Sequence, residues 1–213
     1  MMKFKIFAIL GLITSGFSFY SGQKLHFKDK NLEKAVLENF DLNKNGSLES
    51  LEADKVTNLF LVQKNITSAD DLVFFKNVKM VVMDDNTIPA ISISGMDHLE
   101  LFSCTGCRIS SFKATNLKKL STLYLDNNLL ENISLKEIPA IEQLTLSLNQ
   151  LKTIDVTSFR NLKKLNIEQN RIQKLDISEN TALQTLNIGG NKMKESDIQK
   201  GSGAHPTIFG NED

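Results

Sequence analysis

The chain has 213 residues, a length that corresponds to one domain or to one domain with a small attachment. Its 25 Lys and Arg residues balance 25 Asp and Glu residues, so the chain carries no strongly basic field for a nucleic acid or an anionic membrane. Hydrophobic residues make up 41% and charged residues 23%, which excludes wholesale disorder. Two Cys and three His are too few for a disulfide scaffold or a histidine-based active site. We therefore expect a neutral, soluble, non-enzymatic domain.

Residues 1–18 have the layout of a secretory signal peptide. Lys3 and Lys5 form a short basic region, an apolar run follows, and Gly16 and Ser18 fit the small-residue preference of a cleavage site. The apolar run is too short for a spanning helix of about 20 residues. We expect cleavage after Ser18 and a mature chain that is secreted, periplasmic or on the cell surface; an uncleaved anchor is the alternative.

Residues 19–55 are expected to form a helical cap in front of the following segment. Apolar residues at helical spacing predict a helix over 31–40, and a second short helix is expected from residue 50 to about residue 55. A cap of this kind covers the open end of a repeat array.

The loop between these two helices carries oxygen-bearing side chains at its positions 1, 3, 5, 9 and 12, with Gly46 at position 6. This is the spacing of an EF-hand loop, in which alternate oxygens surround a calcium ion and the final Glu binds through both carboxylate oxygens. The expected ligands are Asp41, Asn43, Asn45, the Ser47 carbonyl, Glu49 and Glu52. We expect a low-affinity calcium site; the alternative is a cap that keeps the shape of the loop without a cation.

A motif of the form L-x-x-L-x-L-x-x-N-x-L recurs about every 21 residues after the cap. Seven units start at residues 56, 78, 99, 120, 141, 162 and 183, and one clear copy consists of Leu120, Leu123, Leu125, Asn128 and Leu130. The pattern resembles that of leucine-rich-repeat proteins, and its combination with an EF-hand-like cap is similar to the secreted bacterial internalins. The resemblance implies an α/β solenoid over residues 56–200, with a parallel sheet on the concave side and short extended segments on the convex side.

Alternation within each unit predicts which side chains form the core. The apolar residues should point inward, and the Asn at the ninth position should bond backbone groups that would otherwise be buried without partners. Cys104 and Cys107 occupy an inward position and the Asn position of the third unit. We therefore expect packed free thiols, with a disulfide between them as the alternative.

Side chains at positions 3, 5 and 7 of each unit should face outward on the concave sheet. Apolar side chains gather there in the first three units, with one Tyr near the middle, and an exposed apolar group of this kind usually marks a binding surface. The expected partner contacts are Phe60, Val62, Met80, Val82, Leu101 and Tyr124. The alternative is that the cap folds over Phe60 and Val62.

The segment after residue 200 differs from the repeats. Gly201, Ser202 and Gly203 are followed by a polar terminus in which only Ile208 and Phe209 are candidate core residues. We expect residues 201–213 to form a flexible tail, without a C-terminal cap.

Together these features favour an exported binding module that is not an enzyme. We expect a monomer whose partner is a protein or a glycan on the concave face, with neither a nucleic acid partner nor a transmembrane segment after signal cleavage. The three His are scattered, and no nucleophile motif or pair of acids in a pocket is found. The alternatives are a structural or calcium-buffering surface protein, or an accessory domain to an enzyme.

Overall fold

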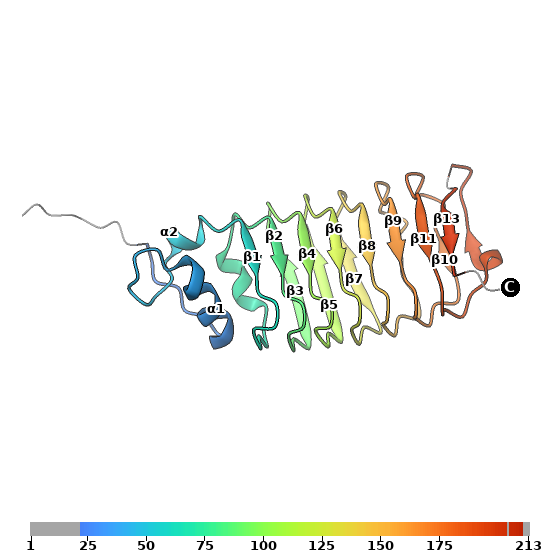
Figure 1. The fold of residues 1–213 in the computed structure, drawn as a ribbon. Coiled ribbons are helices and arrows are strands. Elements are labelled where there is room, and N and C mark those ends of the chain that lie inside the picture. The colour runs from blue at the N-terminus through green and yellow to red at the C-terminus, as the bar shows by residue number, and fades with distance from the viewer. Residues whose placement is uncertain (1–21, 204, 211–213) are drawn as a thin grey trace, which may run out of the picture.

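The computed structural model describes residues 22–203 and 205–210, which form an elongated solenoid with a helical cap at one end (Figure 1). The predicted signal peptide, residues 1–18, lies outside the described residues. The cap is blue in Figure 1, and successive coils lead from it to the red end of the chain. In the part of the chain that the structure describes, no helix is long and apolar enough to cross a membrane.

Each repeat contributes one short strand to a parallel sheet, which we call the main sheet. Its strands in spatial order are β1 (Asn58–Phe60), β2 (Met80–Val82), β4 (Leu101–Ser103), β6 (Thr122–Tyr124), β8 (Gln143–Thr145), β9 (Lys164–Asn166), β11 (Thr185–Asn187) and β13 (Thr207–Phe209). Neighbouring strands pair at equivalent repeat positions, so that Leu123 lies opposite Leu144 and Leu144 opposite Leu165. In all seven predicted units the middle residue of the strand is the predicted inward apolar residue, and it is buried. The predicted solenoid and its repeat register are confirmed.

A ladder of buried Asn side chains follows the main sheet along its turns. The Asn149 amide nitrogen donates to the carbonyl oxygens of Leu125 (2.9 Å) and Leu146 (3.0 Å), and its oxygen accepts from the backbone nitrogen of Leu130 (3.0 Å). The same pattern is made by the buried Asn86, Asn128 and Asn170 and by the half-buried Asn191. Each amide links its own turn to the preceding repeat and bonds backbone groups that water cannot reach.

The opposite side of the solenoid is divided into two smaller parallel sheets. One contains β3 (Ala90–Ser94), β5 (Ser111–Thr115) and β7 (Ile133–Lys136), the other contains β10 (Leu175–Asp176) and β12 (Ile198–Gln199), and two 3-10 helices, η1 (Asp70–Phe74) and η2 (Glu195–Asp197), lie in the first and last repeats. These segments confirm the short extended pieces expected on this side.

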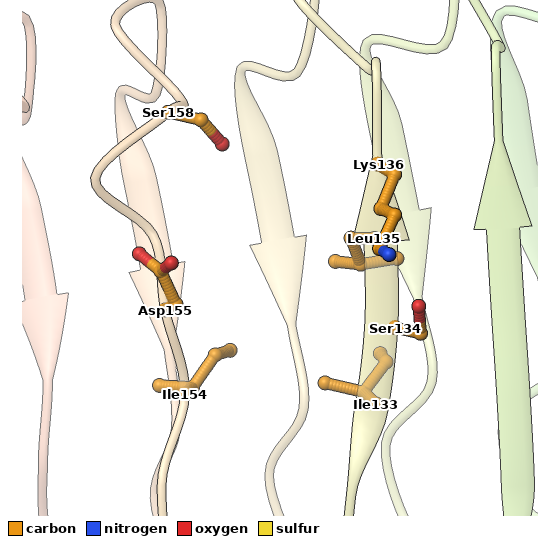
Figure 2. A pocket seen from close by; sticks show the side chains of 7 residues that line it. All are labelled: Ile133, Ser134, Leu135, Lys136, Ile154, Asp155 and Ser158. Atoms are coloured by element: carbon orange, nitrogen blue, oxygen red, sulfur yellow. The ribbon is translucent and has the colours of Figure 1, made fainter.

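Between the two smaller sheets the chain turns instead of forming a strand. The Asp155 carboxylate accepts from the hydroxyl (2.6 Å) and the backbone nitrogen (3.0 Å) of Thr157 and so forms a local turn. These two hydrogen bonds hold the pKa of Asp155 below its ordinary value. A crevice lined by β7 together with Ile154, Asp155 and Ser158 is the result, and Figure 2 shows Ile133 and Ile154 extending toward each other across it.

The cap contains two helices, α1 (Lys30–Phe40) and α2 (Ser50–Ala53). Leu32, Ala35 and Val36 lie on one face of α1 and are buried in the same hydrophobic core as the repeats. Both helices begin close to the predicted positions, and the apolar face of α1 closes the first repeat.

The buried carboxylate of Asp29 ties the cap to the first repeat. One of its oxygens accepts from the backbone nitrogens of Asn31 and Leu32 (both 2.9 Å), at the start of α1. The other accepts from the backbone nitrogen (2.7 Å) and hydroxyl (2.8 Å) of Thr67 and from the backbone nitrogen of Ser68 (3.0 Å). A single side chain therefore caps the helix and fixes it to the solenoid.

A second carboxylate, that of Asp71, reinforces this junction from the side of the repeats. It is 2% exposed, and one of its oxygens accepts from the backbone nitrogens of Lys28 (2.8 Å) and Asp29 (2.9 Å). The neighbouring Asp70 forms only an exposed ion pair with Lys28 (3.2 Å), and such pairs contribute little to stability.

Cys104 and Cys107 form a disulfide in the third repeat, with their Cα atoms 5.6 Å apart. The expectation of packed free thiols is therefore wrong, and the alternative is correct. Both residues are fully buried, as the repeat pattern requires, and periodicity does not distinguish a buried thiol from a buried disulfide. Cys107 occupies the position that a ladder Asn holds in other repeats. In place of an Asn side-chain oxygen, the Cys107 backbone carbonyl accepts from the backbone nitrogen of Ile88 (2.9 Å).

We expect thiol labelling of the denatured chain to detect no free Cys before reduction and both after it. The double change Cys104→Leu with Cys107→Asn should leave the thermal unfolding midpoint within a few degrees of the original, because it restores the residues that the other repeats carry. Circular dichroism melting measures this. Labelling of the unreduced denatured chain would contradict the disulfide, and a large fall in the midpoint of the double variant would contradict the equivalence of this pair to the Leu and Asn of the other repeats.

The main sheet extends beyond the predicted repeats. β13 pairs in parallel with β11, so an eighth strand lies within residues 201–213, and the expectation of a flexible tail is corrected for Thr207–Phe209. Ile208 takes the inward position and packs against the core. Gly210 adopts a φ of +74°, and a Cβ there would meet the backbone of Gly189 at 2.3 Å, so glycine permits this close approach.

Candidate functional site

The outward face of the main sheet begins next to the cap with five apolar side chains. We call them the apolar group: Phe60, Val62, Met80, Val82 and Leu101. Strand register places Phe60 opposite Val82 and Met80 opposite Leu101, so they form two adjacent rows. Phe60 is 65% exposed and Val62 is 40% exposed, so the cap does not fold over them and the alternative is wrong. The structure therefore brings five of the six predicted contact residues together on one face, where Met80, Val82 and Leu101 are half-buried.

The sixth residue, Tyr124, lies apart from the apolar group. In the row that begins with Phe60 and Val82, Ser103 separates Val82 from Tyr124. The Tyr124 hydroxyl donates to the amide oxygen of Gln143 (3.2 Å) in the next repeat. Tyr124 consequently stands on the polar part of the face.

Three acidic side chains fasten neighbouring strands along this polar part. Asp84 accepts from the Ser103 hydroxyl (2.6 Å) and the backbone nitrogen of Thr105 (2.8 Å). Equivalent bonds join Asp126 to Thr145 and Ser147, and Glu168 to Asn187. We call these contacts the acid brackets. They fix the acids against the sheet, because each carboxylate is bonded across to the following repeat.

Two exposed leucines on the turns beside the main sheet were not predicted from the sequence. Leu129 and Leu148 are 48% and 55% exposed, and the backbone nitrogen of Asn128 donates to the Leu148 carbonyl (3.2 Å), which places the two turns side by side. Leu148 has a φ of +54°, whereas Gly106 and Gly190 hold the same position in other repeats. Gln63 and Gln169 adopt the same conformation at this position, so Leu148 differs from them in being an exposed apolar residue. The sequence does contain this signal, as an apolar residue where a turn favours Gly or Asn.

The predicted calcium loop is folded in three successive side-chain turns. Asp41 accepts from the backbone nitrogens of Asn45 (3.1 Å) and Gly46 (2.9 Å), Asn43 accepts from Asn45 (3.0 Å), and Asn45 accepts from Ser47 (2.9 Å). Gly46 has a φ of +78°, as the sharp turn requires. The six predicted ligands thus lie in one compact loop.

The two Glu residues of the loop are already bonded within the protein. Glu52 accepts from the backbone nitrogens of Leu42 (2.9 Å), Asn43 (3.3 Å) and Glu49 (3.0 Å), the last of these completing a capping box at the start of α2. Glu49 accepts from the amide nitrogens of Asn43 (2.8 Å) and Asn45 (2.5 Å). A cation would have to replace these donors.

No cluster of acidic, His and Cys side chains suited to a metal ion is found among the described residues, and this includes Asp41, Glu49 and Glu52 of the predicted calcium loop. The acids of the outward face are held in the acid brackets.

Comparison with solved structures identifies internalins as structural neighbours. The functional domain of InlJ from Listeria monocytogenes, which includes a cysteine ladder, aligns with a TM-score of 0.71 and 25% sequence identity over 82% of this chain and 40% of that chain. Internalin C2 from the same species aligns with a TM-score of 0.56 and 17% identity, over 86% of this chain and 94% of that chain. This chain therefore spans less than half of the InlJ domain. No protein-family model and no curated protein match the sequence.

These neighbours place the chain in the fold class of internalin-type leucine-rich-repeat proteins. The predicted resemblance is thus confirmed at the level of the solenoid.

Proposed function

We propose that this chain is an exported module that binds a protein partner on the outward face of its main sheet. The observation that carries the proposal is the apolar group, in which Phe60 and Val62 are exposed and the side chains beside them are half-buried. The similarity to InlJ supports it, because that domain shares the repeat architecture at 25% identity. Export rests on the layout of residues 1–18.

The surface has the composition of a protein contact. Aromatic and aliphatic side chains at the centre of an interface provide most of the binding energy, and polar groups surround them. Here Phe60 and Met80 form such a centre, and Asp84 begins the polar part. Leu129 and Leu148 enlarge the apolar surface on the turns. A glycan, the other partner class, would be expected to use the Tyr124 region instead.

Capture experiments with matched variants test this proposal. The immobilised chain is exposed to surface-protein extracts, and bound proteins are cross-linked and identified by mass spectrometry. Phe60→Thr with Val82→Thr should weaken binding by about tenfold or more, because both changes keep strand propensity and remove the apolar centre. A partner that binds the double variant unchanged would place the binding site elsewhere.

Val73→Thr is the control for a general loss of hydrophobic contact. Val73 is 63% exposed but lies on η1, outside the main sheet. This variant should bind as the original chain does. Equal weakening by both variants would indicate nonspecific hydrophobic capture.

We further propose that the cap loop binds calcium weakly. The supporting observations are the oxygen spacing of Asp41, Asn43 and Asn45 and the turn at Gly46, which match the spacing and the turn of an EF-hand loop. Binding would require Glu49 to release two amide nitrogens, so the affinity should be low.

The calcium proposal predicts a small, reversible stabilisation. With a Kd of about 10⁻⁴ M, about 2 mM calcium should stabilise the chain by roughly 1.8 kcal/mol, and magnesium should do much less. A thermal shift that EDTA reverses measures it. Asn45→Asp should increase the shift, because it adds a carboxylate at a position where strong sites use one. Glu52→Gln should lower stability even without calcium, since it weakens the capping box. No shift with calcium would leave the loop as a cap only.

A further inference from the structure

The loop that carries the calcium proposal also contains the single Asn–Gly pair of the chain, Asn45–Gly46. Both residues are exposed. Because Gly46 has no side chain, its own backbone nitrogen is unobstructed. A Cβ built on Gly46 would meet no heavy atom within 4 Å. An Asn–Gly pair is where a backbone nitrogen most easily reaches the preceding side-chain carbonyl carbon.

Three hydrogen bonds surround the atoms that would react. The Gly46 nitrogen donates to the Asp41 carboxylate (2.9 Å), which is positioned to accept its proton. The Ser47 nitrogen donates to the side-chain oxygen of Asn45 (2.9 Å), where negative charge would develop. The amide nitrogen of Asn45, the leaving group, donates to the Glu49 carboxylate (2.5 Å).

We propose that this loop promotes the deamidation of its own Asn45. The Gly46 nitrogen loses its proton toward Asp41 and bonds to the side-chain carbonyl carbon of Asn45. The bond from that carbon to the amide nitrogen then breaks, ammonia leaves with the transferred proton, and a five-membered succinimide closes between the two residues. Water opens the ring at either carbonyl and yields aspartate or isoaspartate. The net reaction consumes one water and releases one ammonia, with no oxidant or reductant.

The product differs from the starting loop in charge and in contacts. Glu49 loses the Asn45 amide donor and faces a new carboxylate instead. Asp41, the new acid and Glu49 then lie in one short loop, so the cap becomes more acidic with the age of the protein. The reaction needs no cation, so it does not depend on the calcium proposal being correct.

The experiment compares the folded full chain with the same chain unfolded in urea, both at neutral pH in ¹⁸O-labelled water. Peptide mapping measures the label incorporated at residue 45, and isoaspartyl methyltransferase measures isoaspartate. We expect the folded chain to react about tenfold faster than the unfolded chain, a small part of the rate gain that positioned acid–base groups supply in enzymes. Asn45 that persists as long in the folded chain as in urea would overturn the proposal.

A matched pair of variants identifies the base. Asp41→Asn keeps an oxygen acceptor but removes the charge, and it should reduce the folded rate to that of the unfolded chain. Glu38→Gln removes one exposed carboxylate on α1, where it pairs with Lys64, and should leave the rate unchanged. A folded rate that Asp41→Asn does not alter would refute the assigned role of Asp41. The comparison with urea needs no variant and remains decisive if Asp41→Asn does not fold.

Discussion

Replacing Asp29 with alanine is expected to lower the free energy of unfolding by about 3–5 kcal/mol, as measured by urea denaturation. The carboxylate is 5% exposed and accepts five hydrogen bonds, two from the first turn of α1 and three from Thr67 and Ser68. Alanine would leave those donors unpaired, and it would separate the cap from the first repeat. Amide hydrogen exchange should show the loss of protection first in α1.

The contribution of Asp29 should also depend on pH. Burial raises its pKa, but the hydrogen bonds from Leu32, Thr67 and Ser68 outweigh burial and hold the pKa below the ordinary value of 3.8. Because the folded-state pKa is the lower one, this stabilisation is complete above about pH 4 and is lost as the pH falls through the folded-state pKa. The difference between the original chain and Asp29→Ala should therefore shrink in acid.

Asp70→Ala is the control for this prediction. Asp70 lies close to the same junction, but it pairs with Lys28, and both side chains of this ion pair are exposed. The variant should change the free energy of unfolding by less than about 0.5 kcal/mol. An equal loss from both variants would mean that charge, and not the buried hydrogen bonds, holds the cap.

Asn149→Ala is expected to cost about 2–4 kcal/mol, because it removes the partners of three backbone groups in the middle of the ladder. Urea denaturation measures the loss, and Lys152→Ala, an exposed change three residues away, should be close to neutral. Thermal and urea midpoints that Asn149→Ala leaves unchanged would contradict the ladder.

The repeat register was predictable because packing dictates it. Leu123, Leu144 and Leu165 recur at one spacing, and a slip of one residue would turn each of them toward solvent. The cap helix was predictable for the same reason, since Leu32 and Val36 lie on one face.

The disulfide and the eighth strand were not predictable in this way. Cys104 fits an inward position whether its sulfur is oxidised or reduced. β13 begins 22 residues after β11, lacks a ladder Asn and retains only Ile208 as an inward residue, so it leaves almost no periodic signal.

The role of Glu52 could not be predicted for a different reason. A Glu at the last position of a calcium loop is also a Glu in the first turn of a helix, and the sequence is the same for both roles. The structure uses it in a capping box with Glu49. The acid brackets were missed because each depends on a pair of residues in neighbouring repeats, which appears only once the strands are placed side by side.

The acid brackets give the outward face a period twice that of the backbone. Asp84, Asp126 and Glu168 follow one another every 42 residues, and their hydroxyl or amide partners occupy the intervening repeats. Removing the single repeat that lies between two of these acids would keep the leucine register but would bring the two acids to the same position of adjacent repeats. Removing two would restore the alternation. The core of the solenoid can therefore change length by single coils. The alternation of acids and partners on the outward face is kept only when the length changes by two coils.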